Sequence, residues 1–297
     1  MNGMDRPAAD KAASGGFRHR LFAQPGVHLS LAVLGVYAAL AVAVDAGGLA
    51  AGWPLRAGAP WQGISLAHWL GTNAVGQDIA LRVLAGAAGS FAVGVIVTAG
   101  ALGLGTGLGA LAGSFAGRRL DGVLQWLMSV IDAVPFYLLA AAVLFAFAGH
   151  AAALYVTLIV SFWTTPARLV RGEVRRLERR EFVIAARLLG VPRLVALVRH
   201  VLPNALPVIV AQGLIIFVLA IKTEVVLSFI GLGETGGISW GVLLAESAGE
   251  VPSGHFGNFI GATVMMAGLI LAANRLAESL QVAADPRMAA AGRTAVG

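Results

Sequence analysis

Residues 168–207 read RLVRGEVRRLERREFVIAARLLGVPRLVALVRHVLPNALP and form the long polar stretch of a chain otherwise built of apolar runs. Apolar residues recur within it at helical i, i+3, i+4 and i+7 spacing: Phe182, Ala185, Ala186 and Leu189. Gly190 follows directly and Pro192 comes two residues later, which is how a helix ends, because glycine tolerates the left-handed cap and proline cannot continue a helix. We therefore predict a short amphipathic helix from Glu181 to Leu189 that presents a low apolar ridge to another protein.

The composition is that of an integral membrane protein. Apolar side chains make up 58% of the 297 residues and charged ones only 12%, whereas a soluble domain carries about a quarter charged residues. At roughly 20 residues per span, the chain has room for about six spans and their loops. The net charge of +6 would suggest a nucleic-acid partner in a soluble protein. Here the arginines gather in particular loops, so we predict an all-α polytopic protein surrounded by lipid, with no nucleic-acid partner.

Six apolar runs are candidates for these spans: 27–49, 83–117, 123–149, 151–166, a run beginning at 208–221, and 256–273. A cleaved signal peptide is the alternative for the first run, because Ala41-Val42-Ala43 could serve as a cleavage site. The long leader before it and the runs that follow favour a retained span.

Charge asymmetry predicts the orientation. The arginine-rich residues 168–207 precede a region, 223–274, that contains neither lysine nor arginine. Basic loops stay inside, so residues 168–207 are predicted to be cytoplasmic, and an even number of spans then puts both termini in the cytoplasm. The predicted divisions are a tail (1–20), the first span with an external loop (21–82), a core (83–287) containing the loop 168–207, and a second cytoplasmic tail (288–297).

Glycines in the second run predict close helix packing. Gly105, Gly109 and Gly113 repeat every four residues on one helix face, which lets a neighbouring backbone approach. Residues 105–110 also fit the G-x-G-x-x-A nucleotide fingerprint. That fingerprint needs a preceding strand and an acidic residue about twenty positions later, neither of which is found here. Helix packing is the better interpretation.

Three ionisable residues fall within or beside the apolar runs: Asp132, Lys222 and Glu224. A carboxylate at mid-membrane costs about 3 kcal/mol on insertion scales, so these groups should face protein or water. Asp132 could line a pathway or make a packing hydrogen bond beside Pro135, and both interpretations stay open. Lys222 and Glu224 are two residues apart and do not face each other on a helix, which weakens an ion-pair relay between them.

Known catalytic patterns are missing from the sequence. The two lysines, Lys11 and Lys222, do not follow a glycine-rich phosphate loop, so this polypeptide is not expected to hydrolyse ATP itself. The six histidines include no i, i+4 pair, there is no cysteine, and no Gly-x-Ser-x-Gly elbow occurs. We predict no catalytic residue, no metal site and no cofactor.

The stretch 168–207 resembles the cytoplasmic coupling loop of ABC-importer permeases, whose signature is Glu-Ala-Ala, three residues, Gly, nine residues, then Ile-x-Leu-Pro. Ala185, Ala186, Gly190, Leu202 and Pro203 match at this spacing, while Ile184 and His200 stand where the family has Glu and Ile. Glu181 lies one turn before the position of the missing Glu.

Further stretches are similar to dipeptide and oligopeptide permeases. Residues 71–78 resemble Gly-Thr-Asp-x-x-Gly-Arg-Asp, with Asn73 and Gln77 replacing Asp and Arg. Residues 224–241 resemble Glu-Ala-x-Leu-Ser-Phe-Leu-Gly-Leu-Gly followed by Ser-Trp-Gly, and residues 285–287 match the closing Asp-Pro-Arg. The chain is identified over residues 69–287 as a member of the permease subunits of dipeptide/oligopeptide/nickel-type ABC importers.

The resemblance implies a type I ABC-importer permease fold in the bacterial inner membrane. It implies four kinds of partner: a second permease subunit, two ABC ATPases, an extracytoplasmic solute-binding protein and membrane lipid. The residues that it places at the ATPase contact are Glu181, Phe182, Ala185, Ala186, Leu189, Gly190, Leu202, Pro203 and Asn204, and the candidates for the translocation pathway are Asp132, Lys222 and Glu224. An ion-coupled secondary transporter, a membrane enzyme, or an importer of nickel or another non-peptide solute are the alternatives.

Overall fold

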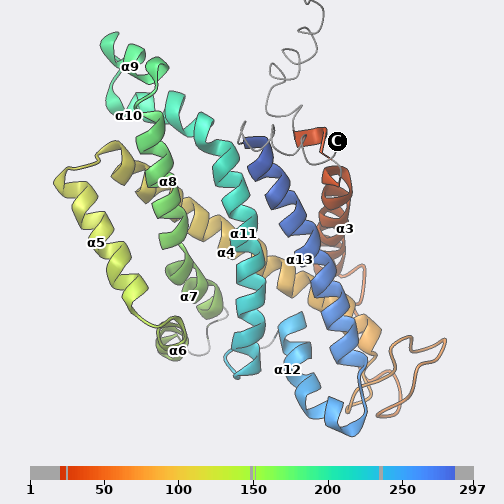
Figure 1. Cartoon of the computed structure of the whole chain (residues 1–297). Coiled ribbons are helices and arrows are strands. Elements are labelled where there is room, and N and C mark those ends of the chain that lie inside the picture. The colour runs from red at the N-terminus through yellow and green to blue at the C-terminus, as the bar shows by residue number, and fades with distance from the viewer. Residues whose placement is uncertain (1–20, 25, 148–149, 151, 234–236, 285–297) are drawn as a thin grey trace, which may run out of the picture.

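The computed structural model describes residues 21–24, 26–147, 150, 152–233 and 237–284, and every regular element in these ranges is helical (Figure 1). Both predicted tails and the Asp-Pro-Arg match lie outside the described residues. The helices are α3 (Val27–Asp45), α4 (Ile79–Ser114), α5 (Arg119–Ala133), α6 (Phe136–Ala146), α7 (Ala153–Phe162), α8 (Thr164–Leu177), α9 (Glu181–Leu188), α10 (Arg193–Ala196), a π-helical turn (Leu197–Val201), α11 (Leu202–Phe229), α12 (Trp240–Glu250), a 3-10 turn (Val251–Ser253) and α13 (Gly257–Ala284).

Five helical segments in the described ranges are long and apolar enough to cross a membrane, or six if one bent pair counts as a span. The five are Val27–Asp45, Ile79–Ser114, Ala153–Leu177, Arg193–Phe229 and Gly257–Ala283. The structure thus confirms a polytopic all-α protein with about six spans.

The sixth candidate span is the pair α5 and α6, which meet at an angle of 90°. The break falls at Val134, whose φ of −81° and ψ of 125° are extended. A residue before proline is driven out of the helical region by the proline ring, so Pro135 accounts for the bend. The apolar run 123–149 is therefore not one straight helix.

Most of the stretch 168–207 is helical and only short parts of it are loop. The helix α7–α8 continues unbroken to Leu177, and the next long helix begins at Arg193. Leu202-Pro203-Asn204 does not break the helix, because the chain runs from the π-helical turn straight into α11. Proline is tolerated in the first turn of a helix, where its missing N–H is not needed. The connection between the two long helices is only residues 178–192.

Helix α4 is the central helix of the bundle. It contacts α3, α5, α7, α8, α11, α12 and α13 and crosses obliquely behind the other helices in Figure 1. Its first turn is capped by Asp78, whose carboxylate accepts a hydrogen bond from the Leu81 N–H at 3.1 Å. The predicted division at residue 82 therefore falls inside this helix. At 36 residues, α4 is long enough to extend beyond the hydrocarbon core.

The glycine repeat on α4 packs against α8, as predicted. A Cβ atom added at Gly105 would lie 2.7 Å from the carbonyl oxygen of Trp163, and one at Gly113 would lie 2.7 Å from that of Arg171. Between them, Gly109 approaches the backbone of Ala167 even more closely. These contacts leave no room for a side chain, so the repeat serves helix packing.

Candidate coupling interface and buried polar sites

The predicted amphipathic helix is present as α9, which lies with α10 at one end of the bundle (Figure 1). Leu189 is its C-cap, and Gly190 follows with a φ of +85°, in the left-handed region. The Gly190 N–H bonds to the carbonyl of Arg187 at 3.0 Å, and the Val191 N–H bonds to that of Ala186 at 3.1 Å. These two bonds form a Schellman cap, so the stop expected from the glycine is found where predicted.

The two faces of α9 have different roles. Val183 is completely buried in an apolar cluster with Val170 and Val174 of α8 and with Val201. On the other side, Phe182, Ala185 and Leu189 are exposed. Leu189 is exposed to 86%, Leu188 to 83% and Phe182 to 44%, and adjoining exposed apolar side chains of this kind are typical of a surface that a partner covers.

The remaining residues of the predicted coupling set are distributed as follows. Ala186 is half-buried and Glu181 is exposed in the first turn of α9, where the helix dipole favours a carboxylate. Leu202, Pro203 and Asn204 lie apart from this ridge, on the first turn of α11. There the Asn204 side chain donates to the His200 carbonyl at 2.7 Å. Ile184 is exposed, so the family's Glu at this position would point outward.

A charged network that sequence reasoning missed lies behind α9. The carboxylate of Glu178 accepts hydrogen bonds from Arg187 at 2.6 Å, from Ser114 at 2.9 Å and from Arg193 at 3.3 Å. The Arg193 guanidinium also lies 5.0 Å from the centre of the Phe115 ring. Nothing in a stretch with nine arginines indicates which of them shares a carboxylate, so the sequence alone could not have found this arrangement.

Asp132 makes a helix-to-helix contact. Its carboxylate pairs with Arg168 of α8 at 2.6 Å and accepts a hydrogen bond from Thr164 at 2.7 Å. Both charged side chains are partly exposed, to 38% for Asp132 and 52% for Arg168. The pair therefore joins α5 to α8 and also presents charge on an outer face of the chain.

A second ion pair, which is more deeply buried, joins the same two helices, α5 and α8. Arg171 donates two hydrogen bonds to Asp121, of 2.6 and 2.9 Å, and only 3% of the Asp121 side chain is exposed. Bidentate arginine–carboxylate pairs fix orientation as well as distance. Asp121 also accepts from the Gly117 N–H at 2.9 Å, so it additionally holds the turn between α4 and α5.

Glu224 and Lys222 lie on different sides of α11, as their spacing predicts. Glu224 is completely buried, and its Oε1 accepts hydrogen bonds from Ser228 at 2.8 Å and from Ser239 at 2.6 Å. Ser239 is also the N-cap of α12, so this carboxylate ties α11 to the start of α12. Lys222 is exposed on the outer face of α11.

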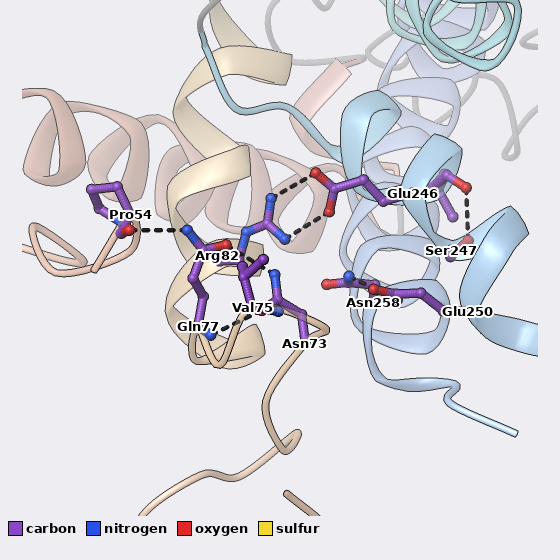
Figure 2. Close-up of polar contacts among 10 residues, drawn as sticks. Pro54, Asn73, Val75, Gln77, Arg82, Glu246, Ser247, Glu250 and Asn258 are labelled. Carbon is purple, nitrogen blue, oxygen red and sulfur yellow. Dashed lines mark hydrogen bonds and ion pairs between the residues drawn. The ribbon is translucent and has the colours of Figure 1, made fainter. Parts of the chain in front are cut away.

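At the opposite end of the bundle, polar side chains join α4, α12 and α13 (Figure 2). Arg82 of α4 donates two hydrogen bonds to Glu246 of α12, of 2.6 and 2.9 Å. One turn later on α12, Glu250 accepts from Asn258 of α13 at 2.9 Å. Burial raises the pKa of the Glu250 carboxyl, and the nearby charge of Glu246 adds to this. The hydrogen bond from Asn258 and the positive charges of Arg82 and His255 act against it.

The loop before α4 shows what replaces the family's Asp and Arg. The Asn73 side chain donates to that of Gln77 at 2.9 Å, and Gln77 in turn donates to the Pro54 carbonyl at 2.9 Å (Figure 2). An uncharged hydrogen-bonded pair thus stands where the motif has an acidic and a basic residue. Within the described ranges, no group of three or more His, Cys, Asp or Glu residues could hold a metal ion.

Several characterised proteins are similar to this chain. It is 32% identical over 222 residues to the oligopeptide transport system permease protein OppC of Mycobacterium tuberculosis, which covers 74% of this chain and 76% of that protein. It is 33% identical over 229 residues to the dipeptide transport system permease protein DppC of Alkalihalophilus pseudofirmus, covering 76% and 74%. It is 34% identical over 231 residues to the glutathione transport system permease protein GsiD of Pectobacterium atrosepticum, covering 76% and 75%.

These relatives are permease subunits, which are transport components rather than enzymes. The family described as "Binding-protein-dependent transport system inner membrane component" matches residues 105–290, which include the coupling stretch, the Asp132 and Glu224 sites and the last span. The agreement extends to the fold, since the described part of the matched region contains several helices long and apolar enough to cross a membrane. This chain therefore belongs to the family of inner-membrane permease components of binding-protein-dependent ABC transport systems.

Proposed function

We propose that this chain is one of two permease subunits of an ATP-driven peptide importer and encloses half of the path across the membrane. The names of the similar proteins refer to oligopeptide, dipeptide and glutathione transport, which supports a peptide as the solute. The proposed partners are a second permease subunit, two ABC ATPases and an external solute-binding protein.

The observation that carries this proposal is the exposed apolar ridge of α9. The helix is held to the bundle by Val183 and by the Arg187–Glu178 ion pair and ends at the Gly190 cap, so it is a rigid element. Its outer side chains Phe182 and Leu189 nevertheless face solvent. A rigid helix with an uncovered apolar face is suited to docking in a groove of a partner protein. We propose that an ATPase subunit covers this ridge.

The proposed orientation puts α9 in the cytoplasm and α12 outside. Gln24, before α3, donates to the Ser279 carbonyl near the end of α13 at 3.1 Å, so both ends of the described chain lie together. They lie at the same end of the bundle as α9 in Figure 1. The arginines around α9 make this the cytoplasmic end by the positive-inside rule.

We propose that Asp132 and Lys222 face the second permease subunit or the water-filled path between the subunits. Both are exposed on this chain alone, Asp132 even while it is paired with Arg168, and an exposed ionised group at membrane depth is costly against lipid. Glu224 is enclosed by its own chain, so we propose that it acts by holding α12 against α11.

Reconstituted transport tests this function. The chain, co-expressed with its partner permease and ATPases, is placed in lipid vesicles, and uptake of a labelled dipeptide is followed. We expect uptake that requires the binding protein and ATP hydrolysis and that persists when ionophores collapse the ion gradients. Uptake without ATP that follows an ion gradient would instead identify a secondary transporter.

A further inference from the structure

Glu178 occupies an internal junction between four elements. It is the residue that caps the end of α8, and its side chain is 11% exposed. Its three hydrogen-bond donors come from different places: Ser114 is the last residue of α4, Arg187 belongs to α9, and Arg193 begins the helix that leads into α11. One carboxylate therefore connects the coupling helix to both long helices that border it and to α4.

The residues around Glu178 also bond to one another. The Nε of Arg193 donates to the Ser114 hydroxyl at 3.1 Å, and that hydroxyl donates to Glu178. Ser114 is fully buried, and Arg193 is further held over the Phe115 ring. Hydrogen bonds to ionised groups that are shielded from water are stronger and less screened by salt than those at the surface. The network is therefore built to keep a fixed geometry.

The Arg187–Glu178 contact fixes the rotation of α9 about its axis, which the buried apolar side chain of Val183 cannot do. Val183 holds the helix by burial, which is non-directional and would allow α9 to roll about its axis. The Arg187–Glu178 contact, by contrast, acts from a defined side of α9 and at a defined distance. Together the two contacts set both the depth and the rotation of the helix relative to the spans.

We propose that Glu178 is the positioning residue of the coupling helix, which makes a displacement of α9 by a docked ATPase move α4 and α11 with it. Glu178 does not need to touch the ATPase for this role. The inference rests on the proposed function, since it assumes that α9 is the ATPase contact. It adds that the link from α9 to the spans is electrostatic and centred on one residue.

The test compares Glu178→Gln with Glu173→Gln in the purified, reconstituted complex. Glu173 is the matched control, because it lies on the same α8 and its ion pair in the described part of the chain is with Arg176, one turn along that helix. Both variants should retain the ATPase subunits. For Glu178→Gln we expect the number of solute molecules transported per ATP hydrolysed to fall on the order of tenfold, since it loses a shielded charged hydrogen-bond network. Glu173→Gln should keep the wild-type ratio, and Glu178→Asp should restore part of it.

A second variant separates positioning from mere folding. Arg187→Gln removes only the α9 side of the junction, and we expect it to lower the same ratio. The double variant Glu178→Gln/Arg187→Gln should be no worse than the more severe single one, because both act on one contact. A wild-type ratio in Glu178→Gln, or in Arg187→Gln if Glu178→Gln does not fold, overturns the inference. Absence of ATPase from the wild-type complex would instead contradict the proposed function.

Discussion

If α9 docks on an ATPase as we propose, its alanines are the residues whose small size we expect to matter most. Ala185 is exposed on the ridge, so a larger side chain there should not disturb the fold. At a covered interface, an unpaired buried charge costs several kcal/mol, or about a hundredfold or more in affinity. Ala185→Glu should therefore release the ATPase during purification. The permease should still insert into the membrane, and its thermal unfolding midpoint should stay at the wild-type value.

The control for this variant is Arg175→Glu. Arg175 is exposed at the same end of the bundle, on α8, and takes part in none of the ion pairs found among the described residues. We expect it to retain the ATPase. If Ala185→Glu co-purified with the ATPase and transported normally, the ridge of α9 would not be the docking surface.

Glu250 gives the polar cluster of Arg82, Glu246, Glu250 and Asn258 a pH dependence. Its pKa is raised in the folded protein, chiefly by burial, so the folded state binds the proton more tightly than the unfolded state. Stability contributed by this residue is then present below the ordinary carboxyl range and is lost as pH rises through that range towards the raised pKa. The contribution of Glu250 to the thermal unfolding midpoint should therefore be larger near pH 4.5 than at neutral pH.

The measurement compares Glu250→Gln with the wild type in detergent between pH 4 and pH 8. The glutamine keeps an acceptor for Asn258 but cannot ionise, so the variant should gain stability relative to the wild type as pH rises. A constant difference between the two proteins across the range would show that Glu250 does not titrate in this window.

At the level of the helices, the packing of α4 on α8 offers a test within one helix. Gly109 approaches the backbone of Ala167, whereas a Cβ at Gly107 would meet nothing within 4 Å. Alanine is a better helix former than glycine by about 1 kcal/mol, so Gly107→Ala should be neutral or slightly stabilising. Gly109→Ala should be destabilising by about 1–3 kcal/mol, because the helices must move apart. Equal unfolding midpoints for the two variants would contradict this packing.

Helix boundaries show where sequence reasoning succeeded and where it stopped. The glycine repeat and the Gly190 stop were predicted correctly because backbone contact and a left-handed φ each require glycine. The continuous helix through Pro203 was not predicted, because a proline in a first turn and a proline that ends a helix have the same local sequence. The bend at Val134–Pro135 was not predicted, because a proline indicates where a helix breaks but not the angle, here 90°, at which its two parts meet.

Over the whole molecule, composition and charge predicted the polytopic fold, while tertiary pairing was out of reach. Asp121 with Arg171 and Arg82 with Glu246 join residues 50 and 164 positions apart. Many arginines could have paired with each of these carboxylates, and only the fold selects among them. The spacing of the predicted coupling residues likewise indicates the exposed ridge of α9. The residues that hold this helix to the bundle, Val183 and Glu178, could not be identified from the neighbouring sequence.

The proposed docking of α9 on an ATPase can be tested directly by cross-linking, because the natural chain has no cysteine. A single cysteine is placed at Leu189, exposed to 86% on the ridge, and another at Leu66, exposed to 98% in the loop at the opposite end of the bundle. Each is coupled to a photoreactive maleimide in the assembled complex. The account predicts an adduct with the ATPase from position 189 and none from position 66. An ATPase adduct from position 66, with none from position 189, would contradict both the docking surface and the orientation of the chain.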